Sequence, residues 1–258
     1  MYMSLFNSVD FIWDVCTEFL YDRELYVDSL SGILGNHNSK KILDCSCGTG
    51  FPAIELKKRG FDLVCSDASI NAVKILKTKL KTENISMPVL NVKWQELNSF
   101  FGEEFDAVLC RGNSISYADS WGRNPADLSR TREEILVSLR NMYSVIKKGG
   151  LLYIDIASLN KNNSLNSVFE KEFSSGKLKG KKLTINSKVN HLLPEKKRQW
   201  VLNVLVEPEN KTHSIYSEGY LLDEPELISM LKQTGFKEIL PCREIKGEKI
   251  YNAFITIK

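Results

Sequence analysis

Short apolar strands alternate with amphipathic helices along this chain, and the first strand ends at a glycine-rich turn; this feature constrains the fold most. The run Ile42-Leu43-Asp44 is apolar and ends in an acid, and Gly48 and Gly50 follow just before a predicted helix. Glycines allow positive φ angles and a close approach of the backbone to a ligand. Such an alternation predicts a parallel sheet with helices on both faces and a ligand crevice at the carboxyl ends of the strands.

The predicted elements continue this alternation through most of the chain. Hydrophobic periodicity and turn residues predict seven strands, at Lys41–Cys45, Leu63–Ser66, Pro88–Val92, Phe105–Cys110, Leu151–Ile156, Glu238–Leu240 and Ala253–Ile257. The predicted helices between them are Pro52–Lys58, Ile70–Lys81, Arg132–Ile146, which Gly149-Gly150 ends, and Glu224–Thr234. The expected fold class is therefore α/β, with a doubly wound, mostly parallel seven-stranded sheet.

Two segments depart from the α/β rhythm. The first 35 residues carry apolar and aromatic side chains at helical spacing, and Gly35-Asn36 ends the predicted helix. After Ser158 the pattern changes to period two, which predicts antiparallel strands at Lys182–Leu192, Gln199–Val206 and His213–Leu222. We therefore expect an N-terminal helical lid (1–35), an α/β domain (36–157 and 223–258) and an antiparallel β insert on the substrate side (158–222).

Two acids bear on which ligand the glycine turn binds. Gly48 to Ala53 also fits the loose G-x-G-x-x-G/A pattern of dinucleotide sites. A carboxylate just before the turn disfavours a pyrophosphate, so Asp44 favours a ligand with positive charge, such as the amino group and sulfonium of S-adenosylmethionine (SAM). Asp67 ends the second strand and can accept both ribose hydroxyls of SAM or of NAD. A turn without a ligand, with Asp67 as a helix cap, is the simpler alternative.

Composition argues against several other classes of protein. The net charge of +3 is small for a nucleic-acid-binding surface. Six cysteines without a CxxC pair, and only three histidines, argue against a metal site and fit a reducing cytosol. The N-terminus lacks the pattern of a signal peptide, and no apolar run is long enough to span a membrane. We expect a cytoplasmic protein that binds neither nucleic acid nor membrane.

The motifs resemble those of class I SAM-dependent methyltransferases. Asp44–Gly50, Val64–Ser69 and Phe105–Cys110 correspond to three successive motifs of that family. The segments Gly112-Asn113-Ser114 and Lys148–Asp155 are similar to small-molecule N-methyltransferases of the glycine and sarcosine type. The resemblance runs from about Arg23 to the C-terminus. It implies a Rossmann-like methyltransferase fold with SAM as methyl donor and S-adenosylhomocysteine as product.

The resemblance also implies roles for particular residues in binding SAM. Its methionine part would lie against Asp44 and the backbone of Cys47, Gly48 and Gly50, and its ribose against Asp67 and Ala68. Trp94 would flank the adenine. The family often has an acid where this chain has Lys93, so Gln95 or a backbone carbonyl would bind the adenine amino group. Arg23 would approach the carboxylate of SAM, and Cys110 and Arg111 would lie beside its sulfur.

The methyl acceptor is less constrained. The resemblance implies that Asn113 faces the substrate amine. Glycine methyltransferases carry an arginine shortly after the acid of the fifth strand, whereas Asp155 is followed here by Ile156-Ala157-Ser158. Because a bidentate clamp on a carboxylate needs an arginine, glycine is a doubtful substrate. Amino-sugar N-methyltransferases share the layout, including a β insert, and are the second subgroup that the chain resembles.

The predicted reaction is methyl transfer to a small-molecule amine, in which the enzyme mainly supplies proximity and orientation. Asn113 would position the amine together with Tyr117, Tyr216 or Tyr220, and a weak base or water would take the proton. Lid aromatics would exclude water: Phe11, Trp13, Phe19, Tyr21 and Tyr26. The loop Tyr117–Arg130 is a second candidate gate.

Several alternatives to this function stay open. Within methyl transfer they are a nucleotide-amino-sugar acceptor and O-methylation of a small metabolite. From other classes they are an NAD-binding oxidoreductase and a non-catalytic SAM-binding protein. A nucleic-acid methyltransferase lacks support, because Arg111-Gly112-Asn113-Ser114 stands where the Asn/Asp-Pro-Pro-Tyr/Phe signature would follow the fourth strand. Assembly into a homo-oligomer is a further possibility.

Overall fold

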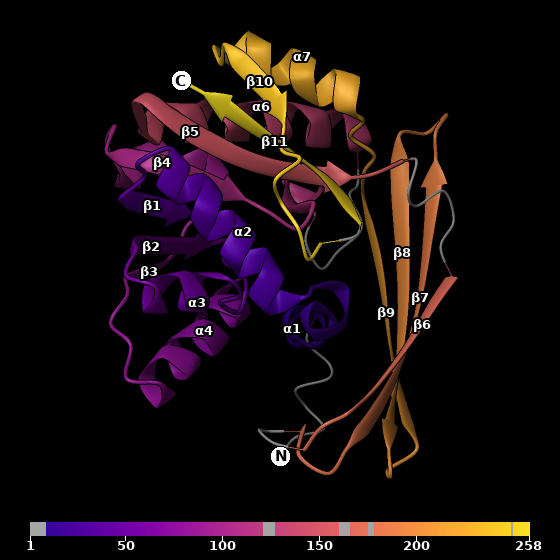
Figure 1. Cartoon of the computed structure of the whole chain (residues 1–258). Helices are drawn as coiled ribbons and strands as arrows, with labels where there is room; N and C mark the ends of the chain where they lie inside the picture. Colours follow the sequence, from indigo (N-terminus) through magenta and orange to yellow (C-terminus); the bar gives the residue numbers. More distant parts are fainter. Residues whose placement is uncertain (1–8, 121–126, 160–165, 175–177, 249) are drawn as a thin grey trace.

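Two β-sheets lie on opposite sides of helix α1 (Val9–Leu20) in the computed structural model (Figure 1). The structure describes residues 9–120, 127–159, 166–174, 178–248 and 250–258. The central part of the loop Tyr117–Arg130, predicted as a gate, lies at residues 121–126 and so outside the described residues. The larger sheet carries the glycine turn, and the smaller sheet faces α1 from the other side.

The larger sheet has seven strands in the order β10-β11-β5-β4-β1-β2-β3. Its members are β1 (Lys41–Asp44), β2 (Asp62–Asp67), β3 (Val89–Asn91), β4 (Phe105–Cys110), β5 (Ile146–Ala157), β10 (Glu238–Pro241) and β11 (Tyr251–Ile257). Neighbouring pairs from β3 to β5 are parallel, and β11 runs antiparallel to both β5 and β10. This is the mostly parallel sheet expected from the sequence.

Helices cover both faces of this sheet because successive strand residues point to opposite sides. Ile42 packs on the face covered by α2 (Arg23–Asn36), α3 (Ala53–Lys58) and α4 (Ile70–Thr82). The next residue, Leu43, packs on the face covered by α5 (Leu97–Phe100), α6 (Leu128–Val145) and α7 (Glu224–Thr234). The result is the three-layer α/β fold that the alternation predicted.

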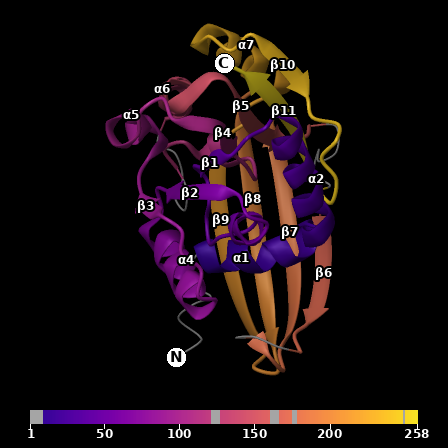
Figure 2. The ribbon, with the colours of Figure 1, turned by 60° about the vertical axis from the view of Figure 1, so that its left-hand side comes forward.

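The smaller sheet is antiparallel, with the order β6-β7-β8-β9. Its strands are β6 (Asn166–Glu172), β7 (Lys182–Leu192), β8 (Lys197–Glu207) and β9 (Lys211–Tyr220). A separate apolar cluster joins it to α1: Ile12, Val15 and Cys16 pack against inward residues such as Leu183 and Leu202. Helix α1 therefore fills the space between the two sheets, and it crosses in front of β7, β8 and β9 in the second view (Figure 2).

The structure corrects three details of the expected elements. The N-terminal region is two helices, because Asp22 accepts a hydrogen bond from the backbone nitrogen of Leu25 and starts α2 anew. The α6 helix starts at Leu128, where Asp127 caps it, and ends at Val145. Gly149 and Gly150 do not end a helix; they lie within β5, which begins at Ile146.

The strand β6 was not expected from the sequence. It pairs along its whole length with β7, from Asn166 opposite Lys188 to Glu172 opposite Lys182. As an edge strand it carries charged residues, which blur the apolar alternation that predicts strands. The three predicted strands of the insert are confirmed, and the smaller sheet has four strands.

Candidate functional site

The turn between β1 and α3 has the backbone conformation for which its glycines are suited. Gly48 and Gly50 have φ angles of +51° and +115°. A Cβ atom on Gly50 would lie 2.6 Å from Leu76 Cδ1 and 2.8 Å from Ile54 Cδ1. Position 50 therefore excludes a side chain both by its φ angle and by the packing of α3 and α4 behind it.

Asp67 ties the end of β2 to this turn. Its Oδ2 accepts a hydrogen bond of 2.8 Å from the backbone nitrogen of Gly48, and its Oδ1 accepts one of 2.8 Å from that of Ser69. Burial, with contributions from Asp10 and Asp44, raises the pKa of Asp67 to about 6. Each carboxylate oxygen has a second lone pair, so a largely ionised Asp67 can still accept two hydroxyl groups at neutral pH.

Asp44 and Arg111 form a buried ion pair beneath the turn. Arg111 Nη2 lies 2.9 Å from Asp44 Oδ2, and the two side chains are 5% and 0% exposed. The same nitrogen donates to the carbonyl oxygen of Phe51 at 2.8 Å. This corrects the charge argument made from the sequence: the positive charge opposite Asp44 comes from the chain itself, and Arg111 is directed at Asp44.

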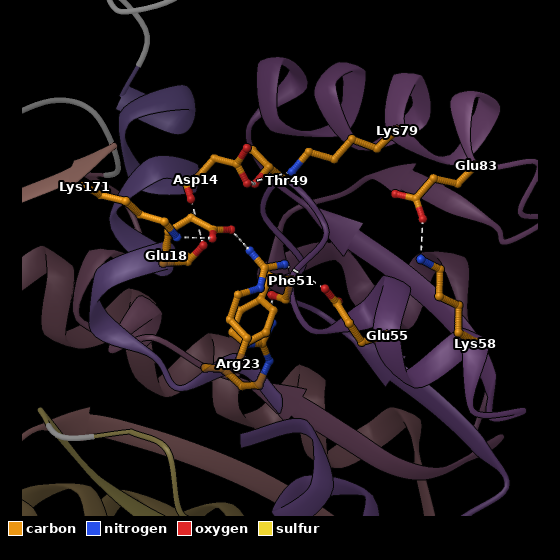
Figure 3. A network of polar contacts seen from close by, with 12 residues as sticks. Asp14, Glu18, Arg23, Thr49, Phe51, Glu55, Lys58, Lys79, Glu83 and Lys171 are labelled. Atoms are coloured by element: carbon orange, nitrogen blue, oxygen red, sulfur yellow. Dashed lines mark hydrogen bonds and ion pairs between the residues drawn. The ribbon is translucent and has the colours of Figure 1, made fainter. Parts of the chain in front are cut away.

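Helix α1 is hydrogen-bonded to the turn (Figure 3). Asp14 Oδ1 accepts hydrogen bonds of 2.6 Å from Thr49 Oγ1 and from Lys79 Nζ. One helical turn earlier, Asp10 Oδ2 accepts a hydrogen bond of 2.9 Å from Ser69 Oγ. The predicted lid thus contacts the segments that follow β1 and β2. The side chain of Phe11 lies outside the described part of the structure.

Arg23 lies near the turn but is engaged with two glutamates (Figure 3). Its guanidinium is 4.3 Å from the centre of the Phe51 ring. It forms an ion pair with Glu18 and a second one, of 2.7 Å, with Glu55. The predicted contact of Arg23 with the carboxylate of SAM would require it to exchange one of these partners.

The other predicted cofactor residues line the strand ends next to the turn. Trp94 Nε1 donates to the carbonyl oxygen of Cys45. Gln95 Nε2 donates to the carbonyl oxygen of Ala118 at 3.2 Å. Ala68 is exposed and directly follows Asp67, whereas Cys47 and Cys110 are buried. Trp94, Ala68 and Asp67 therefore lie, like the glycine turn, at the edge of the sheet formed by the carboxyl ends of the parallel strands.

A cavity of about 240 Å³ lies between α1, the smaller sheet and the segment after β4. Gly112, Asn113 and Tyr117 line it from the larger sheet, and Trp13 lines it from α1. The rings of Trp13 and Trp200 meet edge to face, with centroids 5.8 Å apart. The cavity wall is therefore largely aromatic and apolar, and its polar side chains include Asn113, Ser167, Ser187 and Arg198.

Asn113 is held in a left-handed conformation, with φ of +56°, by buried hydrogen bonds. Its backbone nitrogen donates to Asp155 Oδ1 at 2.6 Å, and its side-chain oxygen accepts from the backbone nitrogen of Ala157 at 2.8 Å. Its Nδ2 and Asp155 Oδ2 are buried and have no hydrogen-bond partner in the structure. Burial also raises the pKa of Asp155 to about 6. The Asn113 amide is thus rigidly placed with two donor hydrogens to spare.

The three candidate tyrosines separate into two groups. Tyr117 lines the cavity, and its hydroxyl accepts a hydrogen bond of 3.1 Å from Arg198 Nη1. Tyr216 is 44% exposed and contacts Gln199 and Glu218. The Tyr220 hydroxyl donates to Glu226 on α7. Along β9, Tyr216 and Tyr220 point away from α1, so the structure does not bring them to the cavity.

Sequence reasoning missed Arg198 and Tyr251, which also line the cavity. Arg198 is 6% exposed and stands at an inward position of β8, where Trp200, Leu202, Val204 and Val206 follow at period two. A charge in register with an apolar face is the signal that marks Arg198 in the sequence. Tyr251 begins β11 and carried no comparable signal.

This strand order, with a single antiparallel strand and a glycine turn after the first strand, defines the Rossmann-like fold of class I SAM-dependent methyltransferases. Residues 42–150 match the family described as "Methyltransferase domain". The chain therefore has the fold of class I SAM-dependent methyltransferases, and residues 42–150 within that fold are similar to a methyltransferase domain.

Curated proteins similar to this chain include glycine/sarcosine and glycine N-methyltransferases. Over 123 residues the chain is 32% identical to a glycine/sarcosine N-methyltransferase of Aphanothece halophytica, covering 47% of this chain and 42% of that protein. Over 136 residues it is 35% identical to a glycine N-methyltransferase of Rattus norvegicus, covering 49% and 43%. The matched part thus spans less than half the length of these relatives.

Solved structures share the fold across almost the whole chain. A SAM-dependent methyltransferase from Clostridium acetobutylicum superposes with a TM-score of 0.71, at 15% identity, covering 95% of this chain and 96% of that one. The sugar N-methyltransferase KedS8 from Streptoalloteichus sp superposes with a TM-score of 0.70, at 18% identity, covering 92% and 88%. The similarity includes the smaller sheet, because it extends well beyond the α/β domain.

The last two observations on the described residues concern metal ions and membranes. Within residues 9–120, 127–159, 166–174, 178–248 and 250–258, no three His, Cys, Asp or Glu side chains are placed to share a metal ion. Over the same part of the chain, no helix combines the length and apolar character needed to cross a membrane.

Proposed function

We propose that this protein transfers a methyl group from SAM to the amine of a small molecule. The observation that carries the proposal is that the Gly112–Asn113 wall of the cavity directly follows β4, beside the glycine turn that follows β1. A cofactor bound at the turn would therefore have its sulfur end next to the cavity. The N-methyltransferase names of the curated relatives support an amine as acceptor.

In this proposal the backbone of Cys47, Gly48 and Gly50 binds the methionine part of SAM, and Asp67 binds the ribose hydroxyls. Trp94 and Gln95 lie toward the adenine. Asp44 acts through Arg111, because the ion pair between them fixes the carbonyl of Phe51 and hence the shape of the turn. SAM supplies an activated methyl group with a neutral leaving group, so no acid is needed.

The chain's own task is to hold a neutral amine in line with the methyl group. Asn113, fixed by Ala157 and Asp155, presents its amide at the cavity, and Tyr117 limits the space beside it. Helix α1 excludes water by closing the other side. We keep nucleotide-amino-sugars as an alternative acceptor class, since the fold of the sugar N-methyltransferase KedS8 covers 92% of this chain.

Calorimetric titration with SAM, S-adenosylhomocysteine and NADH tests the proposal. We expect micromolar binding of SAM and S-adenosylhomocysteine and no binding of NADH. Asp67→Ala removes the acceptor for the ribose hydroxyls and should weaken SAM binding by ~10- to 100-fold. Asp62→Ala, an exposed acid at the start of the same strand, is the matched control. Binding of NADH in place of SAM would refute the proposal.

Two broader features belong to the same proposal. All six cysteines are free and buried, which supports a place in the reducing cytoplasm. The cavity, of about 240 Å³, is lined by the chain's own residues, and its size supports a small-molecule substrate. Whether the protein works as a homo-oligomer can be read from its sedimentation at the same concentration as the activity assay.

A further inference from the structure

Arg198 lies in a position that is unusual for a charged residue. It is the first inward residue of β8, and the inward residues after it are Trp200, Leu202, Val204 and Val206. With 6% of its surface exposed, Arg198 contributes to the cavity wall together with Trp200 and Leu202. The guanidinium is therefore a cation placed among apolar groups at the wall of the cavity.

The described contacts of Arg198 leave its charge uncompensated. Its Nη1 donates to the Tyr117 hydroxyl at 3.1 Å, while its Nε is buried and has no hydrogen-bond partner. No ion pair within the described part of the chain includes Arg198. A buried cation costs free energy unless an anion and hydrogen bonds compensate it. An anionic group of a bound molecule would provide both.

Neutral hydrogen-bond donors lie beside Arg198 or line the same cavity. His191 is its direct neighbour on β7, and burial together with the charge of Arg198 lowers the pKa of His191 to about 4. Both ring nitrogens of His191 lack partners, so a neutral ring can donate one hydrogen bond. The Nδ2 of Asn113 is a further buried donor without a partner.

Two carboxylates near the cavity bind backbone nitrogens through one oxygen each. Asp155 Oδ1 accepts from the backbone nitrogen of Asn113, and Glu248 Oε1 accepts from those of Ile250 and Tyr251. Neither forms an ion pair with Arg198 in the described structure. The cavity wall thus combines one strong cation, Arg198, with the neutral donor Asn113, which favours an anion over a cation or a neutral group.

The placement of Arg198 depends on a glycine opposite it. Gly219 pairs with Arg198 across β8 and β9. A Cβ on Gly219 would lie 2.7 Å from Tyr117 Cε1 and 2.9 Å from its Cδ1. The missing side chain lets the Tyr117 ring lie directly on β9, where its hydroxyl reaches the guanidinium. Arg198, Tyr117 and Gly219 therefore form one preorganised unit.

We propose that Arg198 binds an anionic group, a carboxylate or a phosphate, of the small molecule whose amine faces Asn113. The inference rests on the proposed methyl transfer for the identity of the amine, but the anion site itself rests on Arg198, Tyr117 and the cavity. Nε and Nη2 of Arg198 donate the two parallel hydrogen bonds that such a group accepts. Tyr117 holds Nη1 and keeps the guanidinium oriented, as a positioning residue.

The arginine Nε–H signal of Arg198 provides a direct test. It can be assigned in the ¹⁵N-labelled full-length protein, saturated with S-adenosylhomocysteine, as the signal that Arg198→Lys removes. We expect the signal to shift on titration with glycine or with O-phosphoethanolamine. Glycinamide and ethanolamine, which lack the anionic group of these two compounds, should not shift it. A shift with glycine identifies a carboxylate site, and a shift with O-phosphoethanolamine identifies a phosphate site. Acetate and inorganic phosphate serve as minimal probes at high millimolar concentration.

Failure of this inference and failure of the proposed function give different results. If none of the anions shifts the Arg198 signal, or if the neutral analogues shift it equally, the anion site is refuted, whatever SAM does. If S-adenosylhomocysteine does not bind, the proposed function is refuted. The anion titration of the free protein then still tests whether Arg198 binds an anion. Retention of S-adenosylhomocysteine affinity in Arg198→Lys verifies that the variant is folded.

Methyl-transfer kinetics provide a second readout. With the responding amine as acceptor, Arg198→Met should raise KM by ~100-fold and change kcat much less, because the lost contact binds substrate and transition state alike. Lys188→Gln removes an exposed cation from the same sheet and is the matched control. Gly219→Ala should raise KM in the same direction by displacing Tyr117. An unchanged KM in Arg198→Met would refute the proposal.

Discussion

At the scale of single residues, charges buried beside the turn do most to define the site. Arg111 and Asp44 neutralise each other beneath the glycine turn, and Arg111 reaches on to the carbonyl of Phe51. Asp155 accepts from the backbone of Asn113 and so fixes the left-handed conformation of that residue. Each of these contacts is made in a low-dielectric environment, where a missing partner is costly.

Arg111→Met should destabilise the protein strongly, because it leaves Asp44 buried without its counter-charge. We expect a loss of ~3–5 kcal/mol in the free energy of unfolding, measured by urea denaturation. The double variant Arg111→Met with Asp44→Asn should recover part of this loss. Arg132→Met breaks an exposed ion pair with Glu226 and should cost at most ~1 kcal/mol. Equal losses in the two single variants would contradict the argument.

Asp155 should make stability depend on pH. Its pKa rises from 3.8 to about 6 on folding, so the folded state binds the proton more tightly than the unfolded state. Its stabilising contribution is therefore complete below about pH 4 and is lost as the pH rises through 6. In Asp155→Asn the fall of the unfolding free energy between pH 4 and 6 should be smaller, by up to about 1.4 kcal/mol per pH unit.

Urea denaturation across this pH range measures the effect. Asp67→Asn should remove a second contribution of the same sign, since the pKa of Asp67 is also raised to about 6. An Asp155→Asn profile that runs parallel to that of the unaltered protein would show that Asp155 does not titrate there.

At the scale of elements, α1 is the part on which the site depends most. Its apolar residues Ile12, Val15 and Cys16 pack on the smaller sheet, while Asp10 and Asp14 bond to the segments after β2 and β1. A single helix thus forms one side of the cavity and contacts the glycine turn. That arrangement fits the predicted lid, whose opening remains a prediction.

Asp14→Asn should loosen α1 without unfolding the domain. The substitution removes the charge that pairs with Lys79 and weakens the hydrogen bond from Thr49. We expect faster chymotrypsin cleavage at the junction of α1 and α2, by ~3- to 10-fold, if local opening becomes easier by about 1 kcal/mol. Asp28→Asn is the control. It removes from α2 an exposed charge that pairs with Arg59, and it should be cleaved as fast as the unaltered protein. SAM should slow the cleavage of Asp14→Asn.

At the scale of the whole molecule, the apolar residues form three clusters. Two of them cover the two faces of the seven-stranded sheet, and the third joins α1 to the four-stranded sheet. Figure 1 shows this smaller sheet standing apart from the three-layer domain, with α1 between them. Loss of packing in the third cluster should therefore first destabilise α1 and the cavity wall.

Leu202→Ala and Leu152→Ala should separate these clusters. Both leucines are at most 1% exposed, so each truncation should cost ~2–5 kcal/mol. Native-state hydrogen exchange should show that Leu202→Ala lowers protection mainly in α1, β7 and β8. Leu152→Ala should lower protection throughout the seven-stranded sheet. A uniform loss of protection in Leu202→Ala would mean that the two sheets unfold as one unit.

Much of this architecture follows from local sequence. The apolar strand before Asp44, the two glycines and the acid at the end of β2 predicted the seven-stranded fold, because strand and turn conformations depend on neighbouring residues. The errors arose where tertiary contacts override local preference: Gly149 and Gly150 continue β5, and β6 forms because β7 provides a partner. The domain boundaries and the roles of the site residues remain predictions.

The sequence by itself determined the fold class of this protein, since its glycine turn and terminal acids are contiguous with the strands that position them. Only the tertiary structure decided the chemistry of the cavity. Arg198 contacts Tyr117 and lines the same cavity as Asn113 because the smaller sheet folds back over α1, and no local pattern encodes that approach. The absence of an arginine after Asp155 had argued against glycine as the substrate. Arg198 reopens that possibility from a different strand, because packing in three dimensions, and not sequence spacing, sets which charges share a cavity.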